Sequence, residues 1–107
     1  QSIEGCWKYH LLNNCKEIKD SVFNKMFINI ENLKEFLITI DEYKGNNSED
    51  QENLVATIFF LNLLEIIFSK KEGEFKLIAN KSRKYLTKKG LKTDIQKSSL
   101  AILNKSS

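Results

Sequence analysis

Few residues of this sequence have the types and spacing that a catalytic site requires. Nucleophilic catalysis needs a nucleophile, a base and an orienting group, and His10 is the one histidine in the sequence. The sequence has no glycine-rich phosphate loop, no nucleophile elbow and no His-Glu-x-x-His motif. Two cysteines and one histidine do not complete a four-ligand zinc site. We therefore expect no catalytic residues, no metal and no cofactor, and a protein that is not an enzyme.

The two cysteines, Cys6 and Cys15, allow two interpretations. On one continuous helix they would lie about 13 Å apart along the axis, beyond the roughly 7 Å between Cα atoms that a disulfide tolerates. They can therefore pair only if the chain before the helix folds back. One interpretation is a buried thiol at Cys15, and the other is a local disulfide between Cys6 and Cys15, which would indicate an oxidising compartment.

One carboxylate, Glu65, lies inside the most apolar stretch of the chain. An unpaired charge in apolar surroundings is costly. Glu65 is therefore expected either to face the solvent edge of its helix or to pair with a basic residue or with His10. We expect a structural role for it.

Charge is distributed unevenly along the chain. Residues 70–92 contain nine cationic and two acidic residues, a net charge of +7. Residues 28–54 contain two cationic and seven acidic residues, a net charge of −5. The molecule is expected to have a basic region and an acidic region that attract different partners.

The basic segment contains a regular row of cations. Lys76, Lys84 and Lys88 fall on one row of four-residue steps together with Asn80, and an arginine stands next to it. A basic ridge of this kind fits an acidic protein, a sulfated polysaccharide, a nucleic acid or an anionic membrane surface. A solvated lysine face without a partner is the alternative. The predicted ridge consists of Lys76, Arg83, Lys84 and Lys88.

Among these partners we expect a protein, either a receptor or a host protein. Arg83 is the one arginine among the nine cations of residues 70–92. Because specific phosphate recognition usually relies on arginine, we expect no specific nucleic acid partner. Contact of residues 70–92 with another polyanion is a further interpretation.

The elements that must position these residues are predicted to be helices. The chain has no proline and four glycines, so the usual turn residues of β-structures are missing. Apolar residues recur at steps of three and four through most of the chain. This spacing predicts helices over about 6–27, from Ile30 to Tyr43, over about 49–71, from Phe75 towards Gly90, and a short last one from Thr93 or Asp94 to Leu103.

Two helix boundaries carry their own signals. Ser48 and Gln51 form a capping box with two acids in the first turn, which predicts a helix start after the turn at Gly45. A break near Ile28 and Asn29, with Asn29 as N-cap, is predicted to separate the first two helices.

The predicted fold is all-α, a compact antiparallel four-helix bundle with a short fifth C-terminal helix, in a single domain over residues 1–107. The stretch 54–68 is apolar nearly all round and is predicted to be the centre of the bundle. It is interrupted by Asn62 and Glu65 and falls short of the roughly 20 residues that span a bilayer, so we expect no transmembrane segment.

Residues 72–86, from Glu72-Gly73-Glu74-Phe75 to Arg83-Lys84-Tyr85-Leu86, resemble an amphipathic helix of the short-chain helical cytokines. The resemblance implies a small bundle that docks onto a receptor. The start at Gln1 and three Asn-x-Ser sequons also favour secretion. We therefore predict a secreted or surface-exposed binding protein, cytokine-like or a pathogen surface binder, that docks through charged helix faces.

Two alternatives to this prediction are left open. One is an intracellular, bacteriocin-immunity-like bundle of a low-GC microbe, favoured by the basic charge and by the bias towards Lys, Asn and Ile. The other is a small lipid-binding helical protein, because residues 54–68 supply much apolar surface. A free thiol at Cys15 would favour the intracellular alternative.

Overall fold

The computed structural model describes residues 6–8, 11–12, 21–40, 48–67 and 72–105. Within these residues the chain is all-α and contains no strand, which confirms the predicted fold class. Four helices of eleven residues or more are present in the described part. They are α2 (Ser21–Ile38), α3 (Ser48–Ile67), α4 (Glu72–Lys88) and α5 (Thr93–Leu103).

The predicted break at Asn29 is wrong. Helix α2 runs without interruption through Ile28 and Asn29 to Ile38. The Asn29 side chain is buried and its amide Nδ2 donates hydrogen bonds to the backbone oxygens of Leu103 and Lys105, at 3.0 and 2.9 Å. Because these bonds lie across the molecule, the asparagine caps the C-terminal end of α5 and not the start of its own helix.

The first predicted helix, over 6–27, also differs from the structure. Residues 6–8 are not helical, and residues 21–27 belong to α2. Residues 13–20, which the same prediction covered, lie outside the described part of the chain. The short C-terminal helix, predicted as the fifth, is α5, the last of the four that are described.

The start of α3 at Ser48 agrees with the boundary that the capping box predicts. Helix α4 begins at Glu72, earlier than predicted, and Gly73 lies in its first turn and not in the preceding break. The other end of α4 is closed by Gly90, whose φ of 98° favours glycine.

The bonds at this end of α4 form a Schellman motif. The Gly90 N–H donates to the Thr87 oxygen, and the Leu91 N–H donates to the Leu86 oxygen, both at 3.0 Å. Leu86 and Leu91 are both fully buried, which supplies the apolar contact that accompanies this motif. The turn therefore directs the chain from α4 into α5.

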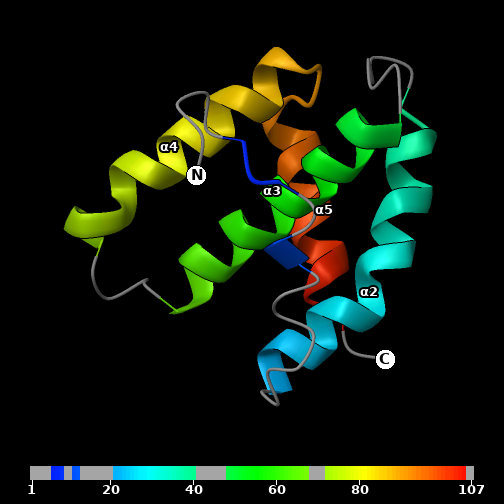
Figure 1. Ribbon diagram of the computed structural model, residues 1–107, viewed down its shortest axis with the longest axis horizontal. Coiled ribbons are helices and arrows are strands. Elements are labelled where there is room, and N and C mark those ends of the chain that lie inside the picture. The colour runs from blue at the N-terminus through cyan, green and yellow to red at the C-terminus, as the bar shows by residue number, and fades with distance from the viewer. Residues whose placement is uncertain (1–5, 9–10, 13–20, 41–47, 68–71, 106–107) are drawn as a thin grey trace.

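The helices pack around a centre formed by α3 and α5. Helix α5 contacts all three other helices, and α3 packs mainly against α4 and also against α2. Figure 1 shows α2 and α4 on opposite sides of the α3–α5 pair. The radius of gyration is 12.9 Å, about the value expected for a folded chain of this length.

Helix α3 is buried as predicted over the first part of the stretch 54–68, whereas Leu63, Leu64 and Glu65 are half-buried and Ile66 is 39% exposed. All ten residues from 53 to 62 are buried. Phe59 is completely buried, and the rings of Phe23 and Phe27 from α2 pack against it with centroids 6.2 and 5.1 Å away. Over the described residues, none of the helices combines the length and the apolar character needed to cross a membrane.

Candidate binding surface

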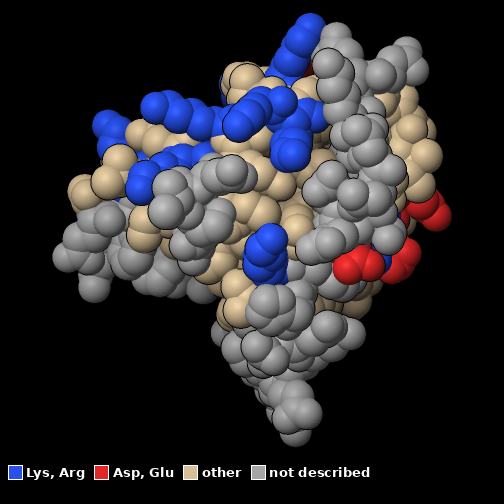
Figure 2. All heavy atoms as spheres, turned by 45° about the horizontal axis from the view of Figure 1, so that its top comes forward, with Lys and Arg blue, Asp and Glu red and all other residues tan. Residues whose placement is uncertain are grey.

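Helix α4 presents one exposed side that is rich in lysine. At 100° per residue, positions 76, 77, 81, 84 and 88 fall within one arc, and all five side chains are exposed. The sequence from 76 to 88 contains no aspartate or glutamate. Figure 2 shows the Lys and Arg side chains gathered on this side of the molecule. We call this surface the lysine face and define it as Lys76, Leu77, Lys81, Lys84 and Lys88.

The opposite side of α4 fixes the lysine face in its outward orientation. Ala79, Ser82, Tyr85 and Leu86 are buried. The ammonium of Lys89, which follows the helix, lies 5.8 Å from the centroid of the Tyr85 ring. Since these residues hold the inner side of α4 in the core, the helix cannot turn about its axis, and the lysines stay on its exposed side.

The C-terminal end of α4 is held by a buried glutamine from α5. The Gln96 Nε2 donates to the Leu91 oxygen at 2.7 Å and to the Thr87 hydroxyl at 3.0 Å. Gln96 is 7% exposed, so these bonds satisfy an amide that would be costly to bury without partners. They fix the position of Lys88 relative to α5.

Arg83, a member of the predicted ridge, differs from the four lysines because its charge is paired. Its guanidinium donates to Glu65 Oε1 of α3 at 2.5 Å and to Asn80 Oδ1 at 2.8 Å. Of the two environments expected for Glu65, the structure has the pairing with a basic residue, and the partner is Arg83. Both side chains are more than a third exposed, so the pair contributes little to stability. The arginine charge is matched within the α3–α4 interface.

Sequence reasoning missed two members of the lysine face. Lys81 stands outside the four-residue row but only three residues before Lys84, so it is on the same side of the helix. Leu77 is 67% exposed although it is apolar. The 100° periodicity over the whole helix, in place of a single row, would have found both.

A second charged surface lies between α2 and α3. A groove of about 260 Å³ is lined by Glu31 and Glu35 of α2 and by Gln51 and Glu52 of α3. Its apolar lining consists of Leu37, Ile38 and Val55, and the remaining lining residue is Lys34. We call this surface the acidic groove.

Three features of the acidic groove bear on what it can bind. Glu31, Glu35 and Glu52 are exposed, and the nearby ammonium of Lys34 lies 3.4 Å from Glu31. Ile38 is 70% exposed at the edge of the groove. The surface therefore offers carboxylates beside an aliphatic contact.

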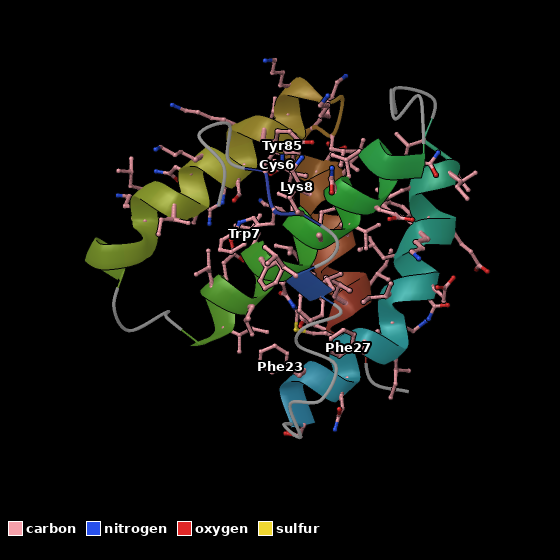
Figure 3. All side chains as sticks on the ribbon, viewed as in Figure 1. Cys6, Trp7, Lys8, Phe23, Phe27 and Tyr85 are labelled. Atoms are coloured by element: carbon pink, nitrogen blue, oxygen red, sulfur yellow. The ribbon has the colours of Figure 1, made fainter. Side chains whose placement is uncertain are left out.

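The N-terminal segment lies across α3 and α4. The Trp7 backbone N–H donates to the Thr57 hydroxyl at 3.0 Å, and its indole N–H donates to the Ser82 hydroxyl at 3.2 Å. The indole stacks on Phe60 with ring centroids 4.6 Å apart. Figure 3 shows Trp7 beside α3. These bonds satisfy two buried hydroxyl groups and hold the segment in a non-helical conformation.

The predicted disulfide remains a prediction. Cys6 is buried, with 6% of its surface exposed. Cys15 and His10 lie outside the described residues, so neither the pairing of the cysteines nor the environment of the histidine follows from the structure.

In the part of the chain that the structure describes, no three His, Cys, Asp or Glu side chains are grouped so that they could hold a metal ion. Among the described residues, the lysine face and the acidic groove are two surfaces whose charge suits binding. No protein-family model, curated protein or solved structure is significantly similar to this chain.

Proposed function

We propose that this is a non-enzymatic binding protein whose lysine face docks onto an acidic surface of a receptor or host protein. The observation that supports the proposal is the lysine face itself. Four exposed lysines share one side of α4, and the sequence from 76 to 88 contains no acidic residue. A cluster of charges of one sign accelerates association with an oppositely charged partner and determines its orientation.

The composition of the lysine face favours a protein over other polyanions. Leu77, next to Lys76 at the N-terminal end of the lysine face, is 67% exposed. Protein interfaces combine apolar and charged contacts, whereas a sulfated polysaccharide or a nucleic acid backbone contacts mainly the cations. Lysine ammonium groups also lack the fork geometry with which arginine binds phosphate in a bidentate manner. An acidic protein with an aliphatic pocket fits both features.

The proposal includes a secreted or surface-exposed location, which the sequons support. The state of the two thiols distinguishes this location from the intracellular, immunity-like alternative. Alkylation under denaturing, non-reducing conditions followed by intact mass measurement counts the free thiols. A disulfide between Cys6 and Cys15 supports secretion, and two alkylated thiols support the intracellular alternative.

The finer topology also belongs to the proposal. An antiparallel four-helix bundle with a short fifth C-terminal helix is the arrangement predicted from the sequence. Residues 13–20, within the predicted first helix, lie outside the described part of the chain. The docking proposal depends only on α3, α4 and α5, which are described.

A matched pair of charge variants tests the proposed function. The variant Lys76→Glu/Lys84→Glu changes the lysine face. The control Lys25→Glu/Lys105→Glu changes two exposed lysines that line a different groove, between α2 and the C-terminal end of the chain. Both variants alter the net charge by the same amount. The wild type and both variants are immobilised and used to capture proteins from an extract of the organism that produces this protein. The captured proteins are quantified by mass spectrometry.

We expect the wild type and the control to capture the same acidic protein, and the face variant to lose at least about 90% of it. Equal capture by all three proteins would contradict the proposal. Retention on immobilised heparin separates specific docking from general attraction. If both variants lose heparin retention equally and no captured protein depends on the face, the lysines act only as a general cationic surface.

A further inference from the structure

The two charged surfaces of this molecule complement each other. The lysine face carries four ammonium groups beside Leu77, and the acidic groove carries three glutamates against one lysine, Lys34, which pairs with Glu31, with Ile38 at its edge. We propose that the acidic groove of one copy binds the lysine face of a second copy. This inference rests on the proposed function, because it names a partner for the same lysine face.

The spacing of the charges is compatible on the two sides. Lys84 and Lys88 are one helical turn apart, and so are Glu31 and Glu35. Two lysines of one copy can therefore face two glutamates of another in the same register. Glu52, from α3, provides a third carboxylate across the groove.

The apolar side chains are complementary as well. Leu77 is 67% exposed on the lysine face, and Ile38 is 70% exposed at the acidic groove. The buried side chains of Leu37 and Val55 also line the groove. Removing two exposed aliphatic side chains from water would add a hydrophobic contribution to the charge attraction.

The arrangement of the helices makes the contact intermolecular. Helix α4 lies on one side of the α3–α5 pair and α2 lies on the other, so a molecule cannot place its own lysine face in its own groove (Figure 1). A contact between two different surfaces is head-to-tail, and each added copy leaves one lysine face and one groove unoccupied. Association therefore continues beyond a dimer unless a ring closes.

The association is expected to be weak and sensitive to salt. A single helix face against a shallow groove buries less surface than a stable interface does. Exposed charge pairs are screened by salt. The same lysine face cannot hold a second copy and an external acidic protein together, so self-association and partner binding compete.

Sedimentation velocity over a range of protein concentrations tests the inference with the protein alone. At about 20 mM salt we expect the weight-average mass of the wild type to rise with concentration, and at about 500 mM salt we expect the monomer mass at every concentration. A wild type that stays monomeric at low salt and high concentration would overturn the inference.

A charge swap makes the test specific to the two surfaces. Lys84→Glu/Lys88→Glu and Glu31→Lys/Glu35→Lys are each expected to remain monomeric at low salt, because each places like charges opposite one another. The four substitutions combined in one chain restore opposite charges and the original net charge, so association is expected to return. The control Lys25→Glu/Lys105→Glu should associate as the wild type does.

The inference can fail in ways that leave the proposed function intact. If the two double variants associate as strongly as the wild type, or the combined variant does not recover, the surfaces are not the contact. The groove variant Glu31→Lys/Glu35→Lys is expected to capture the external acidic protein normally. If the wild type captures the acidic protein through its lysine face but never self-associates, the proposed function stands. The same result refutes a second copy as the partner of the lysine face.

Discussion

The lysine face of α4 and the C-terminal end of α5 use polar side chains in opposite ways. On the lysine face, four ammonium groups are exposed to water. At the end of α5, polar side chains from α2 and α3 are buried and bonded to the chain around Asn104. The first region has charge that is available to a partner, and the second has hydrogen bonds that the fold requires.

The second region is an amide cluster of three asparagines, of which Asn29 and Asn62 are buried and Asn104 is exposed. Asn29 donates to the oxygens of Leu103 and Lys105, and Asn62 and Asn104 exchange two hydrogen bonds of 2.9 Å through their side-chain amides. The last carbonyls of a helix lack partners inside the helix. The cluster provides donors from α2 to this end of α5, so it joins the helices at a point where apolar packing alone would leave polar atoms unsatisfied.

The difference teaches that a polar residue in this protein must be judged by its surroundings and not by its type. Substitution of a buried amide should change the free energy of unfolding and leave the charge of the surface unaltered. Substitution of an exposed lysine should do the reverse.

The largest effect is expected for Asn29→Ala. The substitution leaves the oxygens of Leu103 and Lys105 without their donor and opens a gap between α2 and α5, so the free energy of unfolding should fall by about 1–3 kcal/mol. Urea denaturation followed by circular dichroism measures it. The exposed Asn24 of the same helix is the matched control, and Asn24→Ala should change stability by less than about 0.5 kcal/mol. Equal effects of the two substitutions would contradict the capping role.

A double-mutant cycle tests the bond between Asn62 and Asn104. Asn62 is 1% exposed, and its reciprocal bonds to Asn104 cross 42 positions of the sequence. We expect each single alanine substitution to destabilise the protein and the pair to show a coupling energy of about 1 kcal/mol, obtained from four denaturation curves. Strictly additive effects would mean that the two amides do not depend on each other.

A smaller effect is expected for Glu65→Gln. The carboxylate pairs with Arg83, but both side chains are more than a third exposed, so solvent screens the attraction. The free energy of unfolding should fall by no more than about 1 kcal/mol, and the loss should shrink in high salt. Denaturation at two salt concentrations measures it, and a large loss that is independent of salt would show that the glutamate is packed as a buried charge.

The smallest effect on stability is expected for the lysine face. Lys76→Glu/Lys84→Glu changes two exposed side chains, so the free energy of unfolding should stay within about 0.5 kcal/mol of the wild type. Partner capture and self-association should nevertheless be lost. A strongly destabilised variant would mean that these lysines have a structural role. That result would contradict the distinction between the exposed lysines and the amide cluster.

Much of the fold follows from the sequence because apolar spacing and capping signals are local. The start of α3 was predicted from Ser48 and Gln51, and the buried centre of α3 from its apolar residues. These features depend on neighbours within one or two turns of the helix. The sequence therefore contains them directly.

The errors arose where a residue serves a distant part of the chain. Asn29 has the type of an N-cap, but its hydrogen-bond partners are 74 and 76 positions away. Trp7 fits the apolar period of a helix, yet its partners are Thr57 and Ser82 on two other helices. No local rule contains such partners. Only the packing of the helices shows that the tryptophan lies in a non-helical segment and that Asn29 stays inside α2.

The candidate site was predicted in part for the same reason. The row of Lys76, Lys84 and Lys88 follows from helical spacing alone. The pairing of Arg83 with Glu65 depends on how α3 and α4 pack, so the sequence did not separate that arginine from the lysines. The acidic groove likewise requires α2 and α3 to be brought together.

The central claim is that the lysine face of α4 is a docking surface, and one titration tests it most directly. The affinity of the captured acidic protein is measured by isothermal titration calorimetry for the wild type, Lys76→Glu/Lys84→Glu and Lys25→Glu/Lys105→Glu. We expect a dissociation constant at least about tenfold higher for the face variant and within about twofold of the wild type for the control. Equal weakening of both variants would show that net charge alone attracts the partner and would contradict the claim.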